Sequence, residues 1–282
     1  MPSPTFFLVG APKAGTTSLF HYLGQHPAIA IASVKEPCYY APEVPVDADT
    51  DRYRQSRDAY LSLFAHAGDR RVIGEGSVAY FSSAHAAAAI RAAHADAKIL
   101  VMLRDPADRL FAHYAAAVAA GLTREPFAHW ISETADAEAA RTPRWGPIWA
   151  GCYGTHLATW RAHFPADQIH LCDYADFSRD PDAVLTGIFT FLGVDPRVRI
   201  DHRARLNVTT RPRFPRAITA PARAVLARLL PATALARVRG WARTPAPHTP
   251  TATERANAIA LYRDEIASLS AQTGRHYSHW LR

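Results

Sequence analysis

The sequence predicts an α/β fold in which helices cover both faces of a parallel sheet. Short apolar, β-branched segments alternate with longer segments of helical periodicity, and glycine or proline ends several of the helical ones. The expected strands are 5–9, 71–75, 98–103 and 168–174, and the expected helices are 16–24, 57–66, 84–95, 107–120, 154–164 and 181–192. In such sheets ligands gather at the carboxyl ends of the strands.

One domain is expected for the whole chain, 1–282, because it contains no internal repeat and no long linker. Its core should span about 5–205. The remainder, 206–282, is rich in Ala, Arg and Pro, and we expect helical pieces that cover the core. Within it, a basic amphipathic helix at 217–230 either touches a membrane or presents a solvated cationic face. The last stretch begins at Thr251, has helical spacing and stops at Gly274.

Charge and cysteine content limit the class of protein. The net charge of +7 and pI near 9.5 favour anionic partners, such as nucleotides, acidic glycans, nucleic acid or anionic lipid, unless the surface is merely basic and soluble. Cys38, Cys152 and Cys172 are odd in number and lack the short spacings of thiolate metal sites, so we expect buried thiols in a reducing compartment. The apolar stretch 5–9 lacks a basic leader and is too short for a signal or a membrane span. A cytoplasmic protein without a transmembrane segment is predicted.

The segment GAPKAGTTSL joins the first strand to the first helix, where backbone N–H groups and the helix dipole favour an anion. It is P-loop-like, since Gly10 and Gly15 fit the G-x-x-x-x-G-K-[ST] pattern. However, Thr16 occupies the position of the lysine, and Lys13 stands inside the turn. The strand 98–103 is followed by Arg and Asp with no convincing metal-binding carboxylate, so no metal site is expected. A magnesium-dependent kinase is therefore disfavoured.

A phosphate bound without a metal needs protein cations, and Lys13 and Arg104 supply them. A lysine inside the turn can neutralise the charge that builds on a leaving phosphate. The alternative for Lys13 is a solvated loop charge.

Five segments in a specific order resemble the PAPS-dependent sulfotransferases, and the bacterial and heparan-sulfate-type group in particular. They are GAPKAGTTSL, VKEPCYY, LRDPADRLFAHY, GCYGTHLATWRAHFPADQIHLCDYADF and FLGV, over about residues 5–195, with a weaker similarity in LYRDEIASLSAQTGRHYSHWL. The resemblance implies the sulfotransferase fold. It also implies that 3′-phosphoadenosine 5′-phosphosulfate (PAPS) binds at the loop, that its sulfuryl group moves to an acceptor hydroxyl or amine, and that adenosine 3′,5′-bisphosphate (PAP) is released.

The resemblance also implies cofactor-binding residues. The 5′-phosphosulfate segment corresponds to Lys13, Ala14, Gly15, Thr16, Thr17 and Ser18. Arg104 matches the arginine that binds the 3′-phosphate, whereas Ala112 stands where the family usually has a serine for the same task, which Arg109 or His113 could take over. Arg211 and Arg213 stand where a C-terminal basic loop closes over this phosphate, although the usual glycine and lysine pattern is absent.

Sulfuryl transfer to an alcohol needs a base for the acceptor proton, and Glu36 is the candidate, because its KEP surroundings resemble the segment with the catalytic glutamate of heparan-sulfate-type enzymes. Lys35 is either a phosphosulfate contact or a solvated neighbour. Glu75, at a strand end, is the alternative base, unless it binds backbone N–H groups of the next turn. Gly76 follows it where the family often has a cation. None of the fourteen histidines lies in the pattern of the histidine-using enzymes.

The aromatic residues allow two interpretations. Tyr39, Tyr40, Tyr80 and Phe81 either line an acceptor groove or pack in the core. A further group, expected to be structural, comprises Tyr153, His156 and Trp160.

The function predicted from the sequence is transfer of the sulfuryl group of PAPS, by in-line displacement, to a hydroxyl of a carbohydrate or another small-molecule alcohol. The alternatives are a P-loop kinase that uses ATP and magnesium, and a non-catalytic protein that binds anions or nucleic acid. Nucleic acid is not the expected partner, because the basic residues are spread along the chain and no nucleic-acid-binding module is present.

Overall fold

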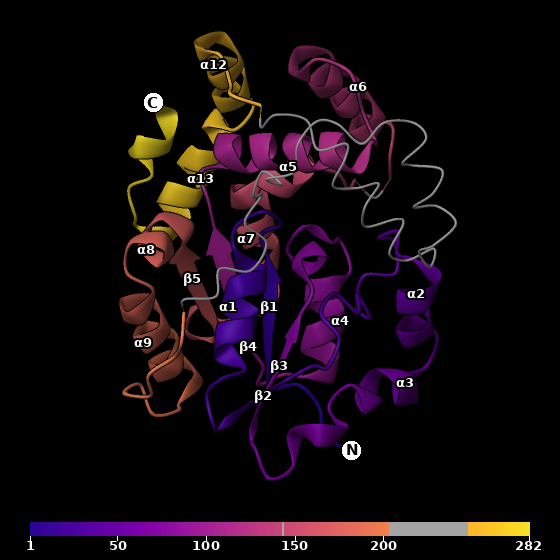
Figure 1. The fold of residues 1–282 in the computed structure, drawn as a ribbon, viewed down its shortest axis with the longest axis vertical. Helices are drawn as coiled ribbons and strands as arrows, with labels where there is room; N and C mark the ends of the chain where they lie inside the picture. Colours follow the sequence, from indigo (N-terminus) through magenta and orange to yellow (C-terminus); the bar gives the residue numbers. More distant parts are fainter. Residues whose placement is uncertain (143, 203–247) are drawn as a thin grey trace, which may run out of the picture.

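The fold is known from a computed structural model that describes residues 1–142, 144–202 and 248–282. Its centre is a five-stranded sheet in the order β2-β3-β1-β4-β5, with every neighbouring pair parallel (Figure 1). The strands are β1 Phe6–Gly10, β2 Ile29–Ile31, β3 Val72–Gly76, β4 Lys98–Leu103 and β5 Ile169–Asp173. The four expected strands and the α/β class are thus confirmed. The sequence did not predict β2, whose three residues are too few for a periodic pattern.

The helices follow the expected alternation. They are α1 Thr16–Leu23, α2 Ala48–Gln55, α3 Arg57–Ser62, α4 Ala86–Ala93, α5 Pro106–Ala120, α6 Phe127–Ala139, α7 Tyr153–His163, α8 Tyr174–Arg179, α9 Pro181–Leu192, α12 Ala252–Ala260 and α13 Arg263–Thr273. All six expected helices are present, and 57–66 divides into α3 and a 3₁₀ turn at Ala65–Ala67. The sequence missed α2, α6 and α8. In α2 a single residue, Tyr53, is buried, so no apolar stripe marks it.

Strand β1 forms the middle of the core. Phe6, Phe7, Leu8 and Val9 are all inaccessible to solvent, which means that both faces of the sheet are covered. Helix α1 packs on β1 and β2, and α9 packs on β5. The loop after β1 therefore starts from a fully buried strand, at the carboxyl end of the centre of the sheet.

The described C-terminal part, residues 248–282, is helical. Thr251 forms a capping box with Glu254 at the start of α12, and Gly274, at φ 68°, ends α13. The expected helical spacing is interrupted at Leu261 and Tyr262, which separate α12 from α13. Helix α13 packs on α7 (Figure 1), and its Ile266 and Leu269 are buried.

Two further expectations concern single segments. The basic helix expected at 217–230 lies outside the described residues. All three cysteines are free thiols, with Cys38 and Cys172 buried and Cys152 half-buried. Within the described ranges, the helices are too short or too polar for any of them to cross a membrane.

Candidate functional site

The loop between β1 and α1 has a backbone that depends on glycine. It is tied to the sheet by the Ala11 N–H, which donates to Met102 O at 2.7 Å, and to itself by the Ala14 N–H, which donates to Ala11 O at 3.2 Å. Gly15 has φ 82°, and a Cβ atom there would lie 2.9 Å from the Tyr174 ring. Glycine is thus required twice, for its conformation and for the close approach of Tyr174.

The N-terminus of α1 is suited to an anion. Gly15 is its N-cap and has no side chain that could accept from the N–H groups of the first turn. By contrast, Asp105 caps α5 by accepting from Ala107 N at 2.9 Å and Asp108 N at 3.2 Å. A phosphate or sulfate oxygen can take the place of that carboxylate at α1, where the helix dipole is positive. The three residues of this turn are the predicted Thr16, Thr17 and Ser18.

The two predicted cations meet at the loop. Arg104 follows β4, donates from Nη1 to Lys13 O at 3.1 Å, and lies with its guanidinium 4.9 Å from the centre of the Tyr174 ring. Lys13 is exposed, with φ 65°. Partial loss of water around its ammonium, together with the charge of Arg109, lowers the pKa of Lys13, while the charge of Glu36 acts in the opposite direction. The Lys13 side chain therefore lies within the electrostatic reach of Glu36.

Glu36 lies on the segment that follows β2. Its Oε2 accepts from Val78 N at 2.9 Å, its Oε1 pairs with Lys35 Nζ, and its side chain is 37% exposed. Lys35 is thus paired with the carboxylate next to it. Glu36 and Cys38 have φ of 66° and 52°, and with Lys13 they are the non-glycine residues of positive φ among those that the structure describes. Such conformations persist only where the surroundings impose them, and they cluster at functional sites.

Glu75 is fully buried at the carboxyl end of β3. Its Oε2 accepts from the Tyr80 hydroxyl at 2.8 Å and from the Tyr60 hydroxyl at 3.1 Å. Burial raises the pKa of Glu75 to about 7. The sequence suggested that Glu75 could bind backbone N–H groups of the next turn. In the structure it accepts from two tyrosine hydroxyls instead. A carboxylate that solvent does not reach is also a poorer base for an outside acceptor than the half-buried Glu36.

The aromatic residues divide between core and surface. Tyr80 and Phe81 are buried and belong to the core, whereas Tyr39 and Tyr40 are half-buried, and Tyr39 stacks on Tyr60 with ring centres 4.2 Å apart. The residues expected to be structural are buried: Tyr153, His156 and Trp160. The Tyr153 hydroxyl donates to Arg104 O at 3.0 Å, so it holds the end of β4 in place.

Helix α5 brings two groups near Lys13, and they are the two residues that the sequence offered as substitutes for the missing serine. Arg109 is fully buried and donates to Pro147 O and, at 3.3 Å, to the Tyr262 hydroxyl. Burial, Arg109 and Lys13 lower the pKa of His113 to about 3, so this imidazole is neutral at ordinary pH. Arg109 and His113 are four residues apart on a helix, and this spacing was the available signal that they share a face. Ala112 is half-buried beside them, and the predicted Arg211 and Arg213 lie outside the described residues.

The chain matches known proteins along most of its length. The family model described as the sulfotransferase domain matches residues 3–214. The chain is 29% identical to the human bifunctional heparan sulfate N-deacetylase/N-sulfotransferase 2 over 199 residues, which is 68% of this chain and 22% of that protein. It is 27% identical to the mouse heparan sulfate glucosamine 3-O-sulfotransferase 3A1 over 207 residues, which is 73% of this chain and 49% of that protein. The chain thus corresponds to about a fifth and about half of the length of these two relatives.

A solved structure extends the similarity to the whole chain. The crystal structure of a sulfotransferase from Alicyclobacillus acidocaldarius aligns with a TM-score of 0.77 and 26% identity, and 100% of each chain is covered. The sheet order, the loop after the central strand and the family match agree with the resemblance seen in the sequence. The chain belongs to the sulfotransferase family.

Proposed function

We propose that this protein transfers the sulfuryl group of PAPS to a hydroxyl of a carbohydrate or another small-molecule alcohol. The observation that carries the proposal is the meeting of three features near the end of β1. They are a helix N-terminus without a side-chain cap, a lysine inside the loop, and a half-buried carboxylate, Glu36, whose charge acts on that lysine. PAPS supplies the activated sulfuryl group. No metal is invoked, because Lys13 and Arg104 provide the positive charge.

Each residue then has a distinct role. The N–H groups at the start of α1 hold the 5′-phosphosulfate oxygens, together with the Thr16 and Thr17 hydroxyls. Lys13 stabilises the charge that develops on the phosphate oxygen as its bond to sulfur breaks. Glu36 accepts the proton of the acceptor hydroxyl as the new oxygen–sulfur bond forms, and PAP leaves. Arg104 binds the 3′-phosphate, and we assign Arg211 and Arg213 to closing over it.

The acceptor class rests on the relatives. Two of the similar proteins are named for heparan sulfate, one as an N-sulfotransferase and one as a 3-O-sulfotransferase. Glu36 lies in the segment that resembles theirs, which favours a glycan acceptor. The free thiols accord with a reducing compartment, and we place the protein in the cytoplasm.

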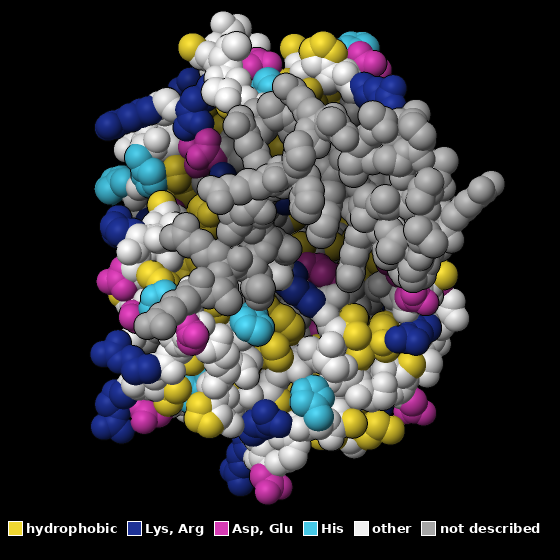
Figure 2. All heavy atoms as spheres, in the orientation of Figure 1, with side chains coloured by type: hydrophobic (Ala, Val, Ile, Leu, Met, Phe, Trp, Pro, Cys, Tyr) yellow, Lys and Arg dark blue, Asp and Glu magenta, His cyan; other side chains and the backbone are white. Residues whose placement is uncertain are grey.

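The distribution of surface charge gives less support to the alternative function, a non-catalytic protein that binds anions or nucleic acid. On the face shown in Figure 2, Lys and Arg side chains gather along the margin formed by α8, α9 and the neighbouring segments. The exposed arginines in this region are paired: Arg179 with Asp176 at 2.5 Å and Arg197 with Asp195 at 3.0 Å. Each of these arginines has a carboxylate partner within the chain, so it is less available to a nucleic-acid phosphate than an unpaired arginine would be.

The test measures transfer from labelled PAPS to a panel of glycans and alcohols, and PAP binding by calorimetry. Glu36→Gln should retain PAP affinity and lose about 10² to 10⁴ in turnover, because general-base catalysis contributes that much. Lys13→Ala should weaken PAP binding and lower turnover together.

Glu133→Gln, on the exposed surface of α6, is the matched control and should behave as the wild type. Normal turnover of Glu36→Gln, or binding of ATP in preference to PAP, would contradict the proposal.

A further inference from the structure

The segment with Glu36 is joined to the turn after β3 by alternating hydrogen bonds. The Glu36 N–H donates to Gly76 O at 2.8 Å, the Cys38 N–H to Ser77 Oγ at 3.0 Å, and the Tyr40 N–H to the Tyr80 hydroxyl at 3.2 Å. Val78 N donates in return to Glu36 Oε2 at 2.9 Å. We call this set of four bonds the 36–40 ladder. It fixes every second residue of the segment and also the carboxylate itself.

The local sequence does not hold this segment in its shape. Glu36 and Cys38 are in the left-handed region, which residues with a Cβ atom avoid. Because local preference opposes the conformation, the tertiary contacts of the ladder must maintain it. Loss of one bond of the ladder should therefore let the segment relax toward ordinary φ values and move the Glu36 carboxylate.

The far end of the ladder rests on the buried Glu75. The Tyr80 hydroxyl has one hydrogen, which it donates to Glu75 Oε2 at 2.8 Å, and this leaves its oxygen lone pairs directed at the Tyr40 N–H. Tyr60 also donates to Glu75 Oε2, but its hydroxyl takes no part in the ladder. Glu75 Oε1 has no partner of good hydrogen-bond geometry among the described residues, although the Ser77 hydroxyl is near enough to oppose the rise in the pKa of Glu75. A carboxylate buried with one oxygen unsatisfied is unfavourable for folding, which is a reason to look for a function.

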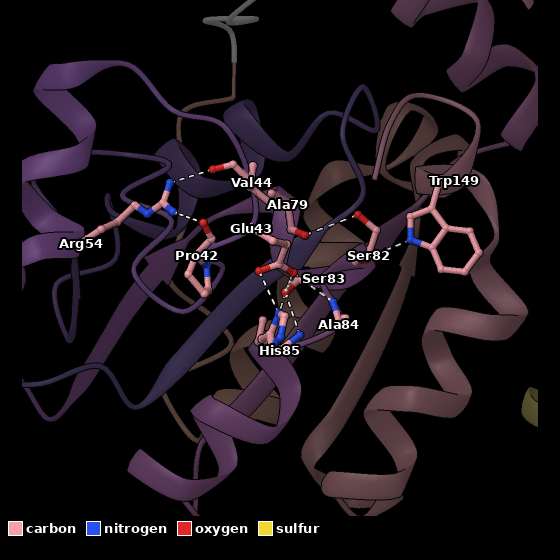
Figure 3. Close-up of polar contacts among 11 residues, drawn as sticks. Pro42, Glu43, Val44, Arg54, Ala79, Ser82, Ser83, Ala84, His85 and Trp149 are labelled. Atoms are coloured by element: carbon pink, nitrogen blue, oxygen red, sulfur yellow. Dashed lines mark hydrogen bonds and ion pairs between the residues drawn. The ribbon is translucent and has the colours of Figure 1, made fainter. Parts of the chain in front are cut away.

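The chain just beyond the ladder is fastened separately (Figure 3). Glu43 accepts from the Ser83 hydroxyl and from Ala84 N at 3.1 Å, and its other oxygen lies 3.1 Å from His85 Nδ1. From the opposite side, Arg54 of α2 donates to Pro42 O and, at 2.7 Å, to Val44 O. The segment 42–44 is therefore anchored by contacts that do not involve Glu75.

We propose that Glu75 is a positioning residue, which acts through the Tyr80 hydroxyl and the Tyr40 amide to hold the 36–40 ladder and thereby to aim the Glu36 carboxylate at the phosphate loop. The part concerning catalysis rests on the proposed role of Glu36 as the base. The part concerning the ladder is a property of the fold.

The chain offers a matched pair of variants. Tyr80→Phe and Tyr60→Phe each remove one hydroxyl bond to Glu75, but only Tyr80→Phe also removes the acceptor of the Tyr40 N–H. We express kcat relative to the concentration of PAP-binding sites, so that misfolded enzyme is not counted. Tyr80→Phe should lower this kcat by about tenfold or more, because the base is no longer aligned, and should leave KM for PAPS unchanged. Tyr60→Phe should retain kcat within about twofold. Glu75→Gln, whose amide oxygen can still accept from Tyr80, should retain more activity than Glu75→Leu.

Amide hydrogen exchange separates this inference from the proposed function, since it requires no activity. Exchange at the amides of 36–40 should be about tenfold faster in Tyr80→Phe than in the wild type, and unchanged in Tyr60→Phe. Equal exchange or equal kcat in the two variants would overturn the inference, even if Glu36 is the base. A wild type without sulfuryl transfer but with this exchange difference would refute the proposed function and leave the ladder in place.

Discussion

At the scale of single residues, the sequence named candidate site residues but not the contacts that orient them. Lys13, Arg104 and Glu36 stand in recognisable segments. In the structure Arg104 donates to Lys13 O, and the charge of Glu36 acts on the Lys13 ammonium. The contacts that orient them come from far along the chain. Tyr80 bonds to a residue 40 positions away, and such a pair leaves no mark in local periodicity. The resemblance assigned Arg104 to the 3′-phosphate and offered Arg109 as a substitute, but the sequence did not show that Arg109 is fully buried.

A substitution at Ala112 tests the inferred 3′-phosphate site. Ala112→Ser restores a hydroxyl where the family usually has one. A charge-assisted hydrogen bond contributes about 1.5 to 3 kcal/mol, so PAP should bind at least about tenfold more tightly by calorimetry.

Ala119→Ser, farther along the same helix, is the control and should leave PAP affinity unchanged. If both variants bind PAP as the wild type does, the 3′-phosphate does not lie beside position 112.

At the scale of elements, the sequence predicted helix boundaries well where cap and stop residues mark the ends of the helix. Helix α5 begins with an Asp cap and Pro106 and ends at Gly121, at φ 74°, and its expected range was nearly right. Helix α6 begins after a proline without a side-chain cap, and α8 is only six residues long, so neither has a clear signature. The loop between β1 and α1 was predictable because the spacing of Gly10 and Gly15 is typical of a loop whose backbone binds an anion at a helix N-terminus.

Alanine substitutions at two glycines of positive φ, Gly15 and Gly121, distinguish an effect specific to the phosphate loop from the backbone strain that both substitutions cause. Gly15→Ala places a Cβ atom 2.9 Å from the Tyr174 ring, which must then move together with the Arg104 guanidinium stacked on it. At Gly121, with φ 74°, a Cβ atom meets nothing within 4 Å. Urea denaturation should show a loss of about 1 kcal/mol for Gly121→Ala and a larger loss for Gly15→Ala.

Calorimetry should show weakened PAP binding for Gly15→Ala alone. Unaltered PAP affinity of that variant would mean that the ring and the guanidinium are not coupled to the phosphate site.

At the scale of the whole molecule, the buried ionisable groups make stability depend on pH. Folding raises the pKa of Glu75 from its usual 4.5 to about 7, so its contribution is intact below pH 4.5 and is lost as the pH rises through 7. The loss amounts to about 3 kcal/mol. His113 and His156 act in the opposite sense. Burial lowers their pKa values to about 3 and about 4, so stability is lost as the pH falls below 6.5.

Glu75→Gln isolates the first of these effects, because the two histidines are common to both proteins. Its free energy of unfolding relative to the wild type should increase by about 3 kcal/mol between pH 4 and pH 8, as measured by urea denaturation. The exposed Glu133→Gln should show no such change. A pH-independent difference for Glu75→Gln would mean that Glu75 does not titrate on its own in this range.

The central position of β1 has a consequence for synthesis of the protein. Its two neighbours in the sheet are Val72–Gly76 and Lys98–Leu103, which leave the ribosome much later. Until β4 has emerged, at least one edge of the apolar strand β1 has no partner in the nascent chain. Unpaired strand edges promote aggregation. We therefore expect truncated chains that end before β4 to depend on chaperones. Once β4 is complete, both edges of β1 can pair.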